Sequence, residues 1–419
     1  MSESSSAVSR RSLLSATAAG ASAALTASAA VAQGVGGLPN RAVGRPQPKL
    51  EESPPWPEDR KVGFAVVGLG KFAMGQIIPA FGESKAAKLV AVVSGSPEKA
   101  QRVAAQHGIG PDGIYDYSNF DRIAQNPKVE VVYVILPNSL HPEFTTRAFQ
   151  AGKHVLCEKP MANTPEECQR MIDAGRRAGK KLMIAYREQY EPHNLEVMRR
   201  IRAGELGDLR VISTDNGRHA DPKDPADQWR LQKSLAGGGA LPDVGIYGLN
   251  AQRYLSGEEP VEVRGWIDSP EGDPRFREVE DVTCWQLRFP SGLIANGSTS
   301  YSYQDASRFE ILGTKARVTM DPAAEYDGHR VMVKDQKGQQ QLAIQEVNQM
   351  AREIDHMAKA VRNNTEVKTP GEEGMQDVRL IHAIYESART GQAVKINWTY
   401  KRRIDAAQAD KDEQPKPPG

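Results

Sequence analysis

Lys159, Asp243 and Tyr247 are the side chains whose types and spacing best suit proton transfer at a hydroxyl or carbonyl group. Lys159 directly follows the run H-V-L-C-E, and ligands bind at the carboxyl ends of such strands in open α/β sheets. A lysine held there can lower the pKa of a neighbouring acid and polarise a carbonyl. The alternative is an ion pair with Glu158 at the end of the strand.

Asp243 and Tyr247 follow the stretch A-G-G-G-A-L-P, in which the glycines indicate a loop and Pro242 suits the first turn of a helix. Their spacing places both residues on one helical face. A tyrosine has an ordinary pKa of about 10, so it needs a nearby cation to act as a base near neutral pH, and Lys159 is the candidate. The alternative makes Asp243 a helix-start charge and Tyr247 a core aromatic residue.

A dinucleotide-binding loop is predicted at G-L-G-K-F-A, which follows the apolar strand V-G-F-A-V-V and opens a helix. Gly68 permits a tight turn, Gly70 lets the backbone approach a pyrophosphate, and Ala73 replaces the third glycine at the helix–strand contact. A plain glycine-rich turn is the alternative. The predicted cofactor contacts of this loop are Gly68, Leu69, Gly70, Lys71 and Phe72.

The end of the next strand favours NADP over NAD. An NAD enzyme usually places Asp or Glu here to hold the ribose 2′-hydroxyl, whereas this strand ends in V-S-G-S with Lys99 one turn later. Ser94 and Lys99, on either side of Gly95, offer a hydroxyl and an ammonium group to a 2′-phosphate that no carboxylate repels. Alternatively, Ser94 caps the following helix and Lys99 is a solvated surface charge.

A further strand ends in L-P-N-S-L-H and faces the same crevice. Asn138 and His141 can meet the pyrophosphate or the nicotinamide side of the cofactor, beside Leu136 and Pro137. Alternatively, Asn138 only organises the turn.

The elements that must position these residues form two domains. Between residues 61 and 185, apolar runs alternate with helices, which predicts a Rossmann-type, doubly wound parallel sheet. From 186 to 398, alternating strands such as V-E-V-R-G-W-I and T-C-W-Q-L-R-F predict an α/β domain with an open, largely antiparallel sheet. Two amphipathic helices, at about 347–363 and 373–390, are expected to close this second domain.

Composition excludes several classes of protein. The chain has 419 residues, 39% of them hydrophobic, and a net charge of +1, which gives no reason to expect a nucleic-acid or anionic-membrane partner. Three cysteines are too few and too irregular for a disulfide framework or a zinc cluster. No histidine pair has H-E-x-x-H spacing, so we expect no metal site.

The N-terminus carries an export signal. Arg10 and Arg11 precede an uncharged run over residues 13–32 that ends in a small-x-small cleavage pattern, which predicts a cleaved twin-arginine signal over residues 1–32 and a periplasmic protein. A membrane anchor is the alternative. The proline-rich segment 33–60 is expected to be a linker, or an arm that grips a neighbouring subunit. The charged tail, 399–419, is expected to be disordered.

G-L-G-K-F-A, E-K-P-M-A and A-G-G-G-A-L-P-D-V-G-I-Y together resemble the glucose–fructose oxidoreductase family, within the larger Gfo/Idh/MocA group, over nearly all of residues 57–398. The resemblance implies that Lys159 and Tyr247 are a catalytic pair and that Asp243 orients the substrate. It also implies a homo-oligomer, with a tetramer expected before a dimer. The implied residues of the cofactor groove are Ser94, Lys99, Tyr117, Leu136, Pro137, Asn138, His141, Glu158, Arg187, Trp229 and Arg230.

The same resemblance implies a ping-pong reaction with tightly bound NADP. One aldose, such as glucose, is oxidised to its lactone, and fructose or another aldose is then reduced, with Tyr247 acidified by Lys159. Twin-arginine machinery exports folded proteins, so the cofactor can travel inside. The segment after Arg187, E-Q-Y-E-P-H, differs from the family and leaves the choice of sugar open. The alternatives are an ordinary NADP-dependent sugar dehydrogenase or reductase, or a non-catalytic exported sugar-binding protein.

Overall fold

The computed structural model describes residues 54–398 and 400–402. The predicted signal, residues 33–53 of the predicted arm and almost all of the predicted tail lie outside these residues. Within the described part, no helix is both long enough and apolar enough to span a membrane.

The N-terminal sheet has six parallel strands in the order β3-β2-β1-β4-β5-β6. The chain order reverses beside β1, so the carboxyl ends of β1 and β4 border the crevice in which such sheets bind ligands. Continuous apolar runs form these strands because helices cover both faces, and every residue of β1 is buried. The predicted Rossmann-type sheet is confirmed. Its strands are β1 (Val62–Val67), β2 (Ala87–Val93), β3 (Ile114–Tyr115), β4 (Val131–Val134), β5 (His154–Glu158) and β6 (Leu182–Ala185).

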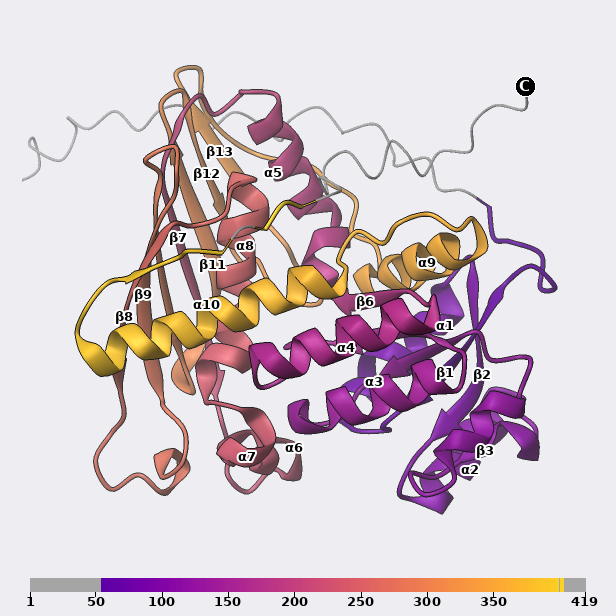
Figure 1. Cartoon of the computed structure of the whole chain (residues 1–419). Helices are drawn as coiled ribbons and strands as arrows, with labels where there is room; N and C mark the ends of the chain where they lie inside the picture. Colours follow the sequence, from indigo (N-terminus) through magenta and orange to yellow (C-terminus); the bar gives the residue numbers. More distant parts are fainter. Residues whose placement is uncertain (1–53, 399, 403–419) are drawn as a thin grey trace, which may run out of the picture. The chain divides into compact units, whose positions relative to one another are not determined.

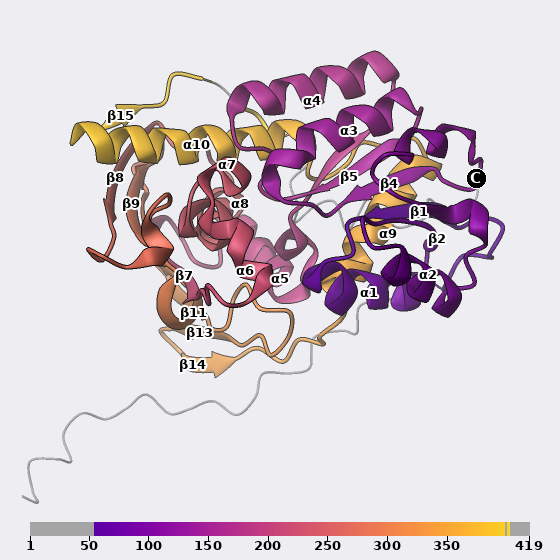
Figure 2. The same ribbon diagram turned by 90° about the horizontal axis from the view of Figure 1, so that it is seen from below.

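Helices lie on both sides of this sheet. Figure 2 shows α3 (His141–Gln150) and α4 (Pro165–Ala178) on one side, and α1 (Ile78–Glu83) and α2 (Pro97–Gln106) on the other. The turn η1 (Ala73–Ile77) joins the glycine-rich loop to α1.

The C-terminal sheet has nine strands in the order β14-β13-β12-β11-β7-β10-β9-β8-β15. The β7–β10 pair is parallel and the other pairs are antiparallel, so the predicted, largely antiparallel sheet is confirmed. Its strands are β7 (Leu209–His219), β8 (Glu262–Asp268), β9 (Val282–Arg288), β10 (Ile294–Ser300), β11 (Ser302–Gly313), β12 (Ala316–Met320), β13 (Val331–Asp335), β14 (Gly338–Gln341) and β15 (Val394–Lys395).

Helix α8 (Ile246–Ser256) packs on β7 of this sheet, and α5 (Pro192–Arg202) packs on α8. Helix α10 (Gly371–Thr390), drawn in yellow in Figure 1, crosses from β8 to α4 and so contacts both domains. A buried arginine joins α8 to α10: Arg253 forms ion pairs with Glu373 and Asp377.

The other late helix, α9 (Gln349–Arg362), covers the N-terminal sheet. Met350, Ile354 and Met357 share one buried core with residues of β1 and β2. Asp355 accepts hydrogen bonds from the Ser84 hydroxyl at 2.5 Å and from the Ala86 N–H at 2.8 Å, which fixes α9 to the start of β2. The expectation that both late helices close the second domain is therefore wrong for α9. An amphipathic pattern shows that a helix has an apolar face, but it does not show which sheet that face covers.

Candidate active site

The three predicted catalytic residues lie together. Lys159 directly follows β5, and its Nζ donates a hydrogen bond to the main-chain oxygen of Asp243 at 2.6 Å. The same Nζ lies 3.9 Å from Asp243 Oδ1 and 4.2 Å from the centre of the Tyr247 ring. Asp243 belongs to the turn η7 (Leu241–Gly245), which leads into α8 and Tyr247. The three side chains therefore lie together, and their catalytic roles stay a prediction.

Asp243 is held as a carboxylate by a ring of donors. Its Oδ2 lies 3.0 Å from Arg230 Nε, 3.4 Å from Arg218 Nη2 and 2.9 Å from the Tyr301 hydroxyl. Burial on its own would raise the pKa of Asp243, but Arg230, Lys159 and Arg218 together hold this pKa well below its ordinary value. An ionised carboxylate at this place can accept hydrogen bonds from the hydroxyls of a polyol.

The ammonium group of Lys159 is bound by Asp243, so the alternative of a simple pair with Glu158 does not describe it. Burial lowers the pKa of Lys159, and the negative charges of Asp243 and Glu158 oppose that shift. The Glu158 carboxylate instead accepts a hydrogen bond from the Tyr133 hydroxyl at 2.7 Å, and burial raises its pKa to about 6.

Two cations lie against the ring of Tyr247. Burial raises the pKa of its phenol, and the charge that most strongly opposes this shift is the guanidinium of Arg187. Lys159 Nζ lies over the face of the ring, and the Arg187 carbon Cζ lies 4.9 Å from the ring centre. Arg187 is thus a second cation beside the phenol, and the expectation that Lys159 acidifies Tyr247 stays a prediction.

Arg187 contributes to the site from inside the protein. It begins the turn η5 (Arg187–Tyr190) after β6, and only 4% of its surface is exposed. Its guanidinium lies between the rings of Tyr247 and Tyr326, at 4.9 and 4.8 Å from their centres. It thus packs on the ring of Tyr247 from inside the protein, and its place in the cofactor groove stays a prediction.

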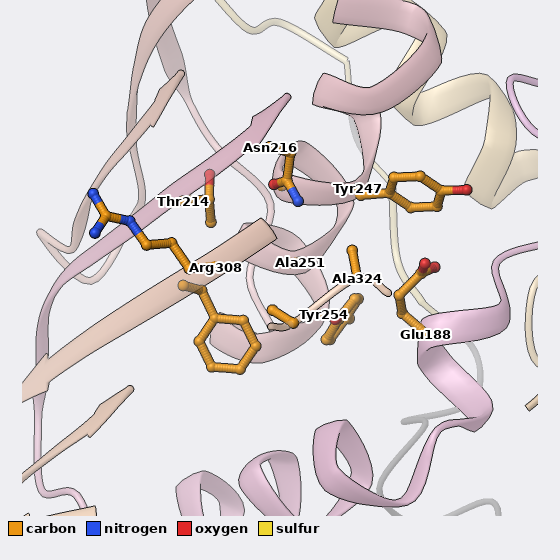
Figure 3. A pocket seen from close by; sticks show the side chains of 11 residues that line it. Glu188, Thr214, Asn216, Tyr247, Ala251, Tyr254, Arg308 and Ala324 are labelled. Atoms are coloured by element: carbon orange, nitrogen blue, oxygen red, sulfur yellow. The ribbon is translucent and has the colours of Figure 1, made fainter. Parts of the chain in front are cut away.

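A pocket lies behind Tyr247, between α8 and the C-terminal sheet (Figure 3). Thr214 and Asn216 of β7 line it together with Arg308 of β11 and the buried Glu188. Tyr247 therefore borders this pocket and also contacts Lys159.

The glycine-rich loop fits a dinucleotide. Gly68 has a φ of 95°, and a Cβ there would lie 2.1 Å from the main-chain oxygen of Ile135, so only glycine fits the turn. A Cβ on Gly70 would meet nothing within 4 Å, so the backbone of this residue is open to a ligand. Lys71 Nζ pairs with Asp224 at 3.0 Å, and the Phe72 ring lies 6.1 Å from that of Tyr326.

The structure decides between the two alternatives at the end of β2. Ser96, and not Ser94, caps α2 by accepting a hydrogen bond from the Lys99 N–H. Lys99 Nζ donates to the main-chain oxygen of Leu69 at 3.0 Å, so this side chain reaches across to the glycine-rich loop. Gly95 packs so closely on Tyr117 that a Cβ would lie 3.0 Å from the ring. The capping alternative for Ser94 is therefore wrong, and Lys99 is not a solvated surface charge.

Main-chain oxygens hold the side chains of Asn138 and His141 in place. The Asn138 side-chain amide donates to the main-chain oxygen of Ala236 at 2.9 Å. The two ring nitrogens of the fully buried His141 lie 2.8 and 2.9 Å from the main-chain oxygens of Leu136 and Pro160. The expectation that His141 meets the cofactor directly is wrong, because backbone carbonyls occupy both of its nitrogens. Pro137 begins the turn that carries Asn138.

Trp229 and Arg230 occupy the turn η6 (Trp229–Leu231) beside Asp243, with the Arg230 guanidinium 4.4 Å from a Trp229 ring centre. Three further residues of the site are not predicted from the sequence. Tyr326 comes from the loop after β12, Arg218 from β7 and Tyr301 from the link between β10 and β11. No motif marks these residues, because their role depends on strands that the fold brings together.

One cluster contains the residue types of a metal site. Glu191, His193 and His329 place ligating atoms within 4.8 Å of one another. However, the Glu191 carboxylate already accepts hydrogen bonds from the N–H groups of His193 and Asn194, at 2.9 and 2.8 Å, and from His193 Nδ1 at 2.6 Å. Glu191 therefore acts as the N-terminal cap of α5.

Sequence profiles of two known domains match this chain. The profile described as "Oxidoreductase family, NAD-binding Rossmann fold" matches residues 62–186, and "Oxidoreductase family, C-terminal alpha/beta domain" matches residues 199–396.

Individual proteins are similar over most of the chain. A D-xylose 1-dehydrogenase [NADP(+)] of Haloarcula marismortui is 32% identical over 346 residues, 81% of this chain and 94% of that protein. A 1,5-anhydro-D-fructose reductase of Ensifer adhaerens is 27% identical over 335 residues, 80% of this chain and 98% of that protein. The crystal structure of an aldose–aldose oxidoreductase from Caulobacter crescentus, complexed with glycerol, has 46% identity and a TM-score of 0.77, with 80% of this chain and 100% of that chain covered.

Proposed function

The chain belongs to the Gfo/Idh/MocA family of NAD(P)-dependent sugar oxidoreductases, and we propose that it couples the oxidation of one aldose to the reduction of a second sugar through NADP that stays bound. The observation that carries this proposal is the cluster of Lys159, Asp243 and Tyr247 beside the carboxyl end of β5. The similarity to an aldose–aldose oxidoreductase supports sugars as both substrates.

The nucleotide, when bound at the glycine-rich loop, supplies a hydride acceptor and donor. Tyr247 takes the proton of the C1 hydroxyl as an aldose is oxidised to its lactone, and later returns a proton to the carbonyl oxygen of the second sugar. Lys159 stabilises the alkoxide that develops in each direction. The ionised Asp243 holds the sugar through its hydroxyl groups.

The preference for NADP rests on Ser94 and Lys99. No carboxylate follows β2 in the stretch Ser94 to Ser96, and the Lys99 ammonium already lies against the loop that would carry the phosphates. A 2′-phosphate at this corner gains a charge-assisted hydrogen bond and meets no like charge.

Export to the periplasm belongs to this proposal. The twin arginines and the cleavage pattern support twin-arginine transport of the folded protein with its cofactor inside. Outside the cytoplasm there is no supply of nicotinamide to exchange with, so the oxidation of one sugar must regenerate the cofactor for the reduction of another.

The test uses protein purified from the periplasm without added nucleotide. The proposal predicts bound NADP in the denatured extract, and conversion of glucose plus fructose, or of glucose plus a second aldose, without added cofactor. Tyr247→Phe is the matched control and is expected to lower turnover by about 100-fold or more while NADP remains bound. Activity that requires added NADP and only one sugar would indicate an ordinary dehydrogenase or reductase. Binding of sugar without any turnover would indicate a binding protein.

A further inference from the structure

The guanidinium of Arg187 occupies a fixed position beside Tyr247. It lies between two tyrosine rings, and Tyr326 forms the far side of this stack. Tyr326 is 42% exposed, whereas Arg187 is almost fully buried. Arg187 therefore lies beneath the surface to which Tyr326 contributes.

Three separate segments hold the guanidinium in place. Nη1 donates to the main-chain oxygen of Glu325 and to Gln349 Oε1 of α9, both at 2.9 Å. Nη2 donates to the main-chain oxygen of Ala324 at 2.5 Å and lies 3.0 Å from Glu188 Oε1. Because acceptors of the protein itself occupy both terminal nitrogens, Arg187 cannot turn towards a substrate without breaking these bonds.

Four charged side chains lie around Tyr247, and Arg187 is one of the two cations among them. Lys159 and Arg187 face the tyrosine with positive charge, and Glu158 and Glu188 face it with negative charge. The phenol of Tyr326 is the other titratable group nearby. Without Arg187, two carboxylates and one ammonium group would remain around a partly buried phenol, and a negative charge on its oxygen would be disfavoured.

We propose that Arg187 is a positioning residue for catalysis: it fixes the ring of Tyr247 and supplies the positive charge that allows the phenol to give up its proton. This inference rests on the proposed role of Tyr247 as the acid–base group. It assigns the buried cation a task that the sequence analysis gave to Lys159. Lys159, which Asp243 holds in place, keeps its proposed task of stabilising the alkoxide on the sugar.

The test compares Arg187→Gln with Arg187→Lys. Glucose is mixed with NADP-loaded protein, and the rate of the single reduction of bound NADP is followed by absorbance across a range of pH. In Arg187→Gln the rise of this rate with pH is expected to move about one to three pH units higher. The rate at neutral pH then falls by about tenfold for each unit of that shift. Arg187→Lys restores the charge, so its pH profile should return towards that of the wild type.

Controls separate this effect from general damage. Arg210→Gln removes an arginine whose side chain is 63% exposed and pairs with Asp208, and it should leave the profile unchanged. The bound NADP per chain, measured after denaturation, is expected to remain at the wild-type value in both Arg187 variants. If Arg187→Gln folds poorly, Arg187→Gln combined with Glu188→Gln removes both charges of the pair and is measured in the same way.

A rate that falls by the same factor at every pH, or a profile that Arg187→Lys does not restore, would overturn the inference and leave Arg187 a structural residue. Failure of the wild-type protein to reduce its NADP with any sugar would instead refute the proposed function. The two failures are therefore distinguishable.

Discussion

Asp243→Asn should make Lys159 lose its proton at a lower pH, and this can be measured as a change in the pH dependence of catalysis. Burial lowers the pKa of Lys159, and the charge of Asp243 is the strongest influence that opposes it. Asparagine keeps the shape of the side chain but removes this charge. Since the protonated lysine stabilises the alkoxide, the reaction should then fail at a lower pH than in the wild type.

The expected size follows from the distance. Asp243 Oδ1 lies 3.9 Å from Lys159 Nζ. Two unit charges about 4 Å apart interact by about 4 kcal/mol at an effective dielectric constant of about 20. This energy corresponds to about three pK units, and shifts caused by one opposite charge span about one to three units. We therefore expect the alkaline fall of the rate to move about one to three pH units lower.

The assay is the single reduction of bound NADP by glucose over a series of pH values. Asp208→Asn is the matched control, because the side chain of Asp208 is 76% exposed. Thermal melting must show that the Asp243 variant is folded, which is expected because Arg218 keeps its partner Asp227 at 2.7 Å. An alkaline limb at the wild-type pH in a folded variant would refute the assignment of Lys159 as the cation that Asp243 maintains.

Three further predictions follow from the described contacts. Lys99→Glu places a negative charge beside the predicted 2′-phosphate. The affinity for NADPH, measured by fluorescence titration, should therefore fall about 10- to 100-fold relative to the affinity for NADH. An unchanged ratio of the two affinities would contradict the NADP assignment. Arg253→Met leaves Glu373 and Asp377 buried with one cation fewer, and urea unfolding should show a loss of about 3–5 kcal/mol; a loss below about 1 kcal/mol would contradict this. The ionised Asp243 carboxylate stabilises the fold above about pH 4, the pKa of an aspartate in the unfolded chain. This stabilisation is lost as the pH falls towards the lower pKa that Asp243 has in the folded protein. The melting temperatures of wild type and Asp243→Asn should therefore converge in acid, and a constant difference would argue against this.

Local pattern and chain order predict the parts of the structure that neighbouring residues determine. Apolar runs between turn signals predict the strands of the first sheet, and G-L-G-K-F-A places Gly68 at a turn that admits no Cβ. The loop with Asp243 and the helix with Tyr247 came from the same kind of reasoning, since proline and the spacing of four indicate a helix start. Lys159 is predicted at the ligand-binding edge of the sheet because the carboxyl ends of parallel strands share that edge.

Contacts between residues far apart in the sequence could not be predicted from local patterns. Tyr326 reaches Arg187 from a loop more than 100 positions further along the chain, so no local spacing connects the two. His141 has the residue type of a functional group, but backbone carbonyls occupy both of its ring nitrogens. The sequence places Arg187 only among the implied groove residues, and no local spacing shows that its guanidinium packs on the ring of Tyr247.

The core of the N-terminal domain includes α9, a helix that is translated late in synthesis. Met350, Ile354 and Met357 finish the core behind β1 and β2, although they leave the ribosome nearly 300 residues after those strands begin. Domains generally fold from the N-terminus as they emerge, but here the part of the nucleotide-binding sheet that α9 covers, beside α1 and α2, stays exposed until residue 362 has been added. In a fragment that ends at residue 185, this part of the face would be exposed to water and to other chains. The cofactor-binding half is thus the first part to be translated and among the last to be finished.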